Sequence, residues 1–170
     1  MAHKKYPTSK GTLQYAELQN RLYFQVTGLA NMDLANPFQK ITQMKLKEAQ
    51  TSFFIDLKEC RGMDSTFMGV LIGIAIYDEG EKKTEVHILN ANSHNKKLMQ
   101  SLGLDQVVYV VPENTMLPKE LHFMELTSST TGDRIKLIHR AHQNLVDIDP
   151  RNAEQFGSFL ELLKKELPPN

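Results

Sequence analysis

The chain has 170 residues, of which 41% are hydrophobic and 24% are charged, a composition typical of one globular domain with a sizeable core. Basic and acidic residues number 20 each, so the formal net charge of zero argues against nucleic acid or an anionic membrane as a partner. Cys60 is the single cysteine, which excludes an internal disulfide. We expect a cytoplasmic protein, because no apolar run is long enough for a signal peptide or a membrane span.

In the first part of the chain, segments whose apolar residues have the spacing of a strand alternate with segments whose apolar residues have the spacing of a helix. The chain is predicted to begin with a flexible tail (1–11), the two strands of a hairpin (12–19 and 21–27) and a helix (37–49). A buried strand that ends in a polar turn (53–57), a helix (65–77), a strand (84–89), a short helix (94–102) and a last strand (107–111) follow. This order predicts an α/β fold with a mixed, mostly parallel β-sheet, helices packed on it and the first strand as an antiparallel edge.

A C-terminal extension, residues 113–170, follows this predicted domain of residues 12–112. Its early part shows no clear period, although residues 121–126 fit either a strand or a covering segment. Helical spacing then predicts two helices, at 133–146 and 152–167, each with an apolar face. Those faces must pack on the sheet domain, on each other or on a second copy of the chain, so a homodimer through the C-terminal helices is one expected arrangement.

The start of the helix at residue 65 is the predicted functional site, because Asp64, Ser65 and Thr66 follow a buried strand. In open α/β sheets, such a helix points its amino end at the carboxyl edge of the strands, where sites form. A phosphoryl group on Ser65 would add about −1.5 to −2 charges. The helix dipole would offset only ~0.3–1 kcal/mol of that charge, whereas a partner would have to desolvate it at roughly several kcal/mol. Modification there is expected to switch binding while leaving the fold intact.

The helix that follows carries no charged residue between Ser65 and Tyr77. A helix that is apolar all round is either buried on all sides or paired with another protein. One interpretation is a contact surface that includes Met68 and Ile72. The other is that the C-terminal helices cover this helix, in which case it is ordinary core. Separately, a small hydroxyl residue at a helix start usually caps the helix, so a cap is the alternative role of Ser65.

Two segments resemble the central signature of STAS domains of the anti-sigma factor antagonist type: Phe-Ile-Asp-Leu at 54–57 and Met-Asp-Ser-Thr-Phe-Met-Gly-Val-Leu at 63–71. In that family a strand ending in Asp-Leu precedes an Asp-Ser-Ser-Gly-Leu-Gly-like segment. The strand at 86–90 and the segment at 98–104, which ends in Leu-Gly-Leu, also lie where the family has them. The resemblance covers residues 13–111.

The resemblance implies a regulator of transcription in bacterial signalling that works by partner switching and is not an enzyme. The unphosphorylated domain would bind an anti-sigma factor that is also a serine kinase, and phosphorylation would end that binding. By motif position the phosphorylated residue is Ser65, with Thr66 as the second choice. Phe67 departs from the family, which typically has glycine there. The predicted partner-binding residues are Asp64, Ser65, Thr66, Phe67, Met68 and Ile72.

Two other functions stay open. In the first, the chain is a STAS scaffold, or a subunit of a larger signalling or lipid-transport complex, and Ser65 is never phosphorylated. In the second, an apolar groove beside the Ser65 helix takes a small molecule or a lipid.

Catalytic, metal and cofactor sites are not expected. His139 and His142 lie three positions apart on one predicted helix but lack further ligands, so both are predicted to face solvent. A hydrolase role for Ser65 would need a histidine base and an acidic residue that orients it, and the Gly-flanked elbow motif is absent. Cys60 is predicted to lie in a loop as an unreactive thiol, and no phosphate-binding glycine motif occurs.

Overall fold

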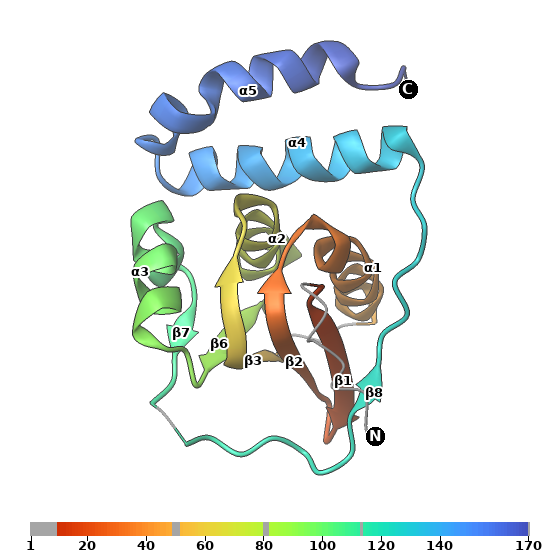
Figure 1. The fold of residues 1–170 in the computed structure, drawn as a ribbon, viewed down its shortest axis with the longest axis vertical. Coiled ribbons are helices and arrows are strands. Elements are labelled where there is room, and N and C mark those ends of the chain that lie inside the picture. Colours follow the sequence, from red (N-terminus) through yellow and green to blue (C-terminus); the bar gives the residue numbers. More distant parts are fainter. Residues whose placement is uncertain (1–9, 49–51, 80–81, 113, 170) are drawn as a thin grey trace, which may run out of the picture.

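The computed structural model describes residues 10–48, 52–79, 82–112 and 114–169, so most of the predicted tail lies outside the described residues. At its centre is a six-stranded sheet in the order β7-β6-β3-β2-β1-β8 (Figure 1). Its strands are β1 (Thr12–Leu18), β2 (Arg21–Ala30), β3 (Ser52–Met63), β6 (Glu85–Leu89), β7 (Tyr109–Val110) and β8 (His122–Phe123). A separate two-stranded ribbon consists of β4 (Asp78–Glu79) and β5 (Lys82–Lys83). The helices are α1 (Met32–Lys47), α2 (Ser65–Ala75), α3 (Ser93–Leu102), α4 (Thr131–Ile148) and α5 (Asn152–Glu166), with a 3-10 turn at Leu104–Gln106.

The predicted α/β class and the mostly parallel sheet are confirmed. Strand β3 pairs in parallel with β2 and β6, β6 pairs in parallel with β7, and β1 is antiparallel to β2. The prediction that the first strand forms the edge is wrong, because β8 pairs with Gln14 and Tyr15 of β1. This pairing also decides between the two interpretations of residues 121–126 in favour of a strand.

Strands β2 and β3 both run further than the sequence predicted. The pair stays in contact through two register shifts, between Gln25 and Thr27 and between Gly28 and Leu29, where Gly28 takes a positive φ of 77°. Such irregularities allow polar, turn-like residues to remain in a sheet. Cys60 consequently lies in β3 and is buried, and its predicted loop position was wrong.

Helix α1 also begins earlier than predicted. Asn31 caps it by accepting hydrogen bonds from the backbone N–H groups of Asp33 and Leu34, and Pro37, the predicted start, lies inside the helix. An asparagine N-cap satisfies N–H groups that would otherwise lack a partner, so it is the stronger start signal. Residues 28–36, which lie between the predicted strand and the predicted helix, are therefore divided between the end of β2 and the start of α1.

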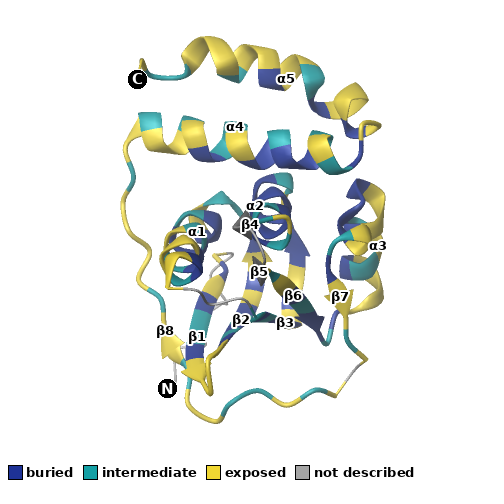
Figure 2. Cartoon of the chain, turned by 180° about the vertical axis from the view of Figure 1, so that it is seen from behind, coloured by how far each residue is buried: buried dark blue, intermediate teal, exposed yellow. Residues whose placement is uncertain are grey.

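The helices build outward from one face of the sheet in layers. Helices α1 and α2 lie next to the sheet, α4 lies across α2, and α5 packs on α4 (Figure 1). The sides of α4 and α5 that face inward are buried (Figure 2). Helix α4 therefore covers the Ser65 helix within the same chain, with α5 packed on α4, whereas a homodimer through the C-terminal helices stays a prediction. No helix within the described ranges combines the length and the apolar character needed to cross a bilayer.

Helices α2 and α4 approach to backbone contact at Gly69. A Cβ added there would overlap the carbonyl group of Ala141, so only glycine leaves room for α4. One turn later a Cβ at Gly73 would lie 2.5 Å from Asn144 Nδ2, and this side chain donates a 3.0 Å hydrogen bond to the Gly69 carbonyl oxygen. Gly69 and Gly73, four residues apart on α2, thus form the surface on which α4 packs.

We predict that Gly69→Ala lowers the free energy of unfolding by about 1–3 kcal/mol, because the added methyl group must push α4 away. The measurement is urea denaturation of the full chain. Gly157→Ala on α5 is the matched control, because nothing lies within 4 Å of its added Cβ. This control should gain up to about 1 kcal/mol from helix propensity. A Gly69→Ala protein as stable as the control would contradict the close approach of α2 and α4.

Candidate functional site

Asp64 joins the starts of two helices. It is the N-cap of α2, and its Oδ1 accepts a 2.8 Å hydrogen bond from the N–H of Phe67. Its Oδ2 accepts a 3.0 Å bond from the N–H of Met32, the first residue of α1. Its own N–H donates to the carbonyl oxygen of Ala30 at the end of β2. One residue therefore holds both helix starts at the carboxyl ends of β2 and β3.

Ser65, the first residue of α2, is half-buried and contacts α4. Its Oγ lies 2.9 Å from Nε2 of His142, while Nδ1 of His142 lies 2.8 Å from the carbonyl oxygen of Ile138. A carbonyl oxygen only accepts, so Nδ1 must carry the proton of the neutral ring. Nε2 is then the acceptor, and the hydroxyl of Ser65 donates to it.

The prediction that His142 faces solvent is wrong. The residue is 3% exposed, and its ring packs at steep angles against Phe156 and Phe159, with centroids 4.9 and 5.0 Å away. The signal was present in the sequence, because His142 lies four residues after Ile138 and three before Leu145, on the apolar face of its helix. His142 is the site residue that sequence reasoning missed.

Burial keeps both titratable groups of the site closer to their neutral forms. It lowers the pKa of His142, against the opposing effects of the Ile138 hydrogen bond and the nearby Asp64 carboxylate. Asp64 is exposed as a whole residue, but its carboxylate lies between the helix starts. Desolvation there raises the pKa of Asp64, against the hydrogen bonds from Phe67 and Met32. A neutral imidazole is the form that accepts from Ser65.

The other predicted site residues point into the protein. Thr66, Phe67, Met68 and Ile72 are all buried, with exposed fractions between 0% and 6%. The ring of Phe67 stacks on Phe38 with centroids 5.2 Å apart, so the residue that departs from the family adds to the core. The partner-binding role of these residues stays a prediction.

The serine–histidine pair lacks the remaining parts of a hydrolase site. His142 is oriented by a backbone carbonyl where a catalytic triad has a carboxylate. The N–H of Phe67 at the helix start is taken by Asp64, which removes a donor that an oxyanion would need. Within the described part of the chain, no three His, Cys, Asp or Glu residues lie close enough together to hold a metal ion.

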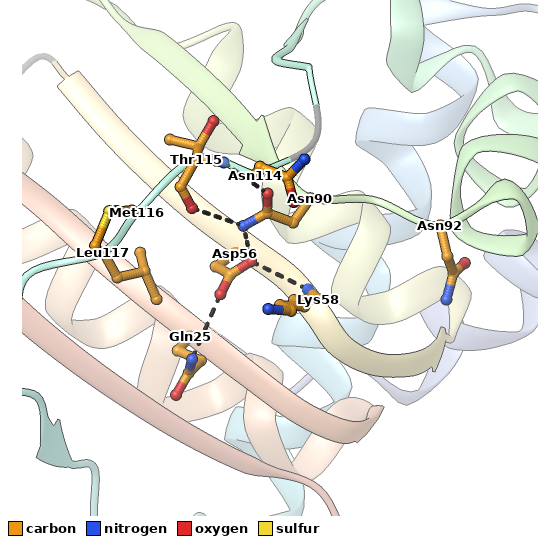
Figure 3. Close-up of a pocket in the computed structure, with 9 residues that line it drawn as sticks. All are labelled: Gln25, Asp56, Lys58, Asn90, Asn92, Asn114, Thr115, Met116 and Leu117. Atoms are coloured by element: carbon orange, nitrogen blue, oxygen red, sulfur yellow. Dashed lines mark hydrogen bonds between the residues drawn. The ribbon is translucent and has the colours of Figure 1, made fainter.

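A second polar site lies around Asp56 of β3, in a cavity of about 610 Å³ (Figure 3). Asp56 is 2% exposed, and its carboxylate accepts hydrogen bonds from Asn90 Nδ2 at 2.8 Å, the N–H of Lys58 at 3.1 Å and Gln25 Nε2 at 3.4 Å. Asn90 also bonds both the N–H and the carbonyl oxygen of Thr115. Asp56 therefore fixes the segment that leaves β7. The cavity is lined by Gln25, Asp56, Lys58, Asn90, Asn92, Asn114, Thr115, Met116 and Leu117.

Comparison with solved structures places the chain among proteins of the STAS fold. A candidate anti-sigma factor antagonist of Thermotoga maritima is 19% identical with a TM-score of 0.52, over 61% of this chain and 87% of that one. An anti-sigma factor antagonist of Mycobacterium paratuberculosis is 13% identical with a TM-score of 0.52, over 76% of this chain and 95% of that one. No family model and no curated protein matches the sequence. The resemblance noted in the sequence is thus confirmed for the fold.

We predict that His142 makes the fold less stable in acid. Its pKa is lowered in the folded state, so its contribution is complete above the ordinary value of 6.5 and is lost as the pH falls below that value. His142→Gln should therefore show a smaller loss of unfolding free energy than wild type between about pH 7.5 and about pH 5. Urea denaturation at both pH values measures this difference. Exposed His94 provides the control: His94→Gln should lose as much as wild type, and an equal loss in all three proteins would contradict the assignment.

Proposed function

We propose that the protein is a cytoplasmic, non-enzymatic regulator of the anti-sigma factor antagonist type. It binds an anti-sigma factor that is also a serine kinase, and phosphorylation of Ser65 ends the binding. The observation that carries the proposal is the position of the Ser65 hydroxyl. It lies at the first residue of α2, beside exposed Asp64, at the carboxyl ends of β2 and β3.

The charge at this position supports a binding switch. The hydroxyl is half-buried, so a partner that covers Asp64 and Ser65 must remove water from whatever the serine carries. A phosphoserine with about two negative charges would have to be desolvated beside the Asp64 carboxylate. The cost of roughly several kcal/mol corresponds to a loss of affinity of more than about tenfold.

A second function is favoured by a different observation. The Ser65 hydroxyl already donates to His142, and α4 covers the helix that carries the other predicted contact residues. A constitutive scaffold or complex subunit, in which Ser65 is never phosphorylated, would need this closed arrangement. The two functions differ in whether a negative charge at Ser65 changes partner binding.

We predict that ATP and an extract of the native cell add phosphate to Ser65, as mapped by mass spectrometry. In pull-downs, Ser65→Ala should retain an anti-sigma factor with a kinase domain, and Ser65→Asp should bind it about tenfold more weakly or worse. Ser93→Asp is the matched control, because Ser93 is the exposed first residue of α3, behind the N-cap Asn92.

Two outcomes would contradict the proposal. One is Ser65 without phosphate under every condition, and the other is a Ser65→Asp protein that binds its partner as tightly as wild type. The second outcome would favour the scaffold.

A further inference from the structure

The C-terminal helices follow the sheet domain after a long connector, which is hydrogen-bonded to α1 at Thr127. An extended connector links β7 to α4, and Figure 1 shows it passing around the sheet. Its described regular structure is the two-residue strand β8. Beyond the connector, α4 packs mainly on α2, and α5 packs on α4. A tethered segment of this kind competes with free partners at a high effective concentration.

Besides the exposed contacts of Arg134 on α4 with Asp33 and Met32 on α1, three buried or half-buried polar contacts help to hold the pair in place. Asn144 Nδ2 donates to the Gly69 carbonyl oxygen at 3.0 Å, and Asn152 Nδ2 donates to the Leu102 carbonyl oxygen at 3.0 Å. The third is the bond from the Ser65 hydroxyl to His142. The first two are accepted by backbone carbonyl groups, which a covalent modification of a side chain does not alter. The third depends on a hydroxyl proton that a covalent modification of Ser65 removes.

A phosphate on Ser65 would act against the docked position of α4 in three ways. The ester oxygen carries no proton, so Nε2 of His142, whose ring packs against Phe156 and Phe159, would lose its donor. The added oxygens would have to occupy space where Oγ and Nε2 are 2.9 Å apart. The new charge would also lie at a half-buried position beside the carboxylate of Asp64.

We propose that α4 and α5 block the α2 surface within the same chain and that a phosphate on Ser65 displaces them from it. His142 is the residue that senses the state of Ser65. An external partner that needs the covered face of α2 must displace α4, and the modified chain presents the inner faces of α4 and α5. This regulation rests on the proposed function for the choice of Ser65 as the modified residue.

The test installs phosphoserine at position 65 during synthesis of the full chain and measures hydrogen exchange of the backbone amides. Exchange across residues 131–148 should become about tenfold faster or more, while residues 52–63 of β3 keep their protection. Phosphoserine at position 93 is the control with the same charge at the same helix position, and it should leave α4 protected. Ser65→Ala, which loses one hydrogen bond and adds no charge, should change the exchange of α4 less than the phosphate does.

Three results would overturn the proposal. Unchanged protection of α4 would show that the phosphate and α4 coexist. Increased protection would show that His142 becomes an imidazolium and binds the phosphate. Loss of protection in β3 as well would show that the phosphate acts on the whole fold. Because no kinase is involved, failure here is distinct from failure of the proposed function, which is tested by phosphorylation in the extract.

Discussion

The fold depends on the burial of α2, a helix without a charged side chain that has to be covered on every side. The sheet and α1 cover part of it, with Phe67 stacked on Phe38. The remaining side is closed by α4, which comes close because Gly69 has no side chain at the point of contact with Ala141. This approach places His142 over Ser65, so the packing of the core and the chemistry of the site are set by the same contact.

The order of elements could be predicted from sequence because it depends on local periodicity. The apolar alternation of the strands and the helical spacing of α4 and α5 are properties of neighbouring residues. The missed boundaries involve competing local signals. The polar residues after Leu57 resemble a turn, yet they pair with a strand through two register shifts. Likewise, Pro37 is a common first residue of a helix, but the cap provided by Asn31 begins α1 earlier.

The site was predicted in part for the same reason. The place of Asp64 and Ser65 at a helix start could be predicted because they follow a strand and begin a helix, which is visible in one short segment. His142 was missed because its partner lies 77 positions away, and no local pattern shows which helix an apolar face will meet. A histidine among apolar residues of one helix face is therefore a useful marker of a polar contact between distant elements. The role of Asp56, which holds Thr115 through Asn90, depends on a distant contact in the same way.

The separation of Ser65 and His142 along the chain has a consequence in time. A ribosome makes the chain from its amino end, so β3 and α2 leave it before α4 exists, and domains begin to fold as they emerge. During that interval the hydroxyl of Ser65 has no imidazole to bond, and the side of α2 that α4 later closes faces water. A newly made molecule therefore passes through an open form before its last two helices arrive. The side of α2 that α4 later covers is therefore accessible in a chain that is still being made.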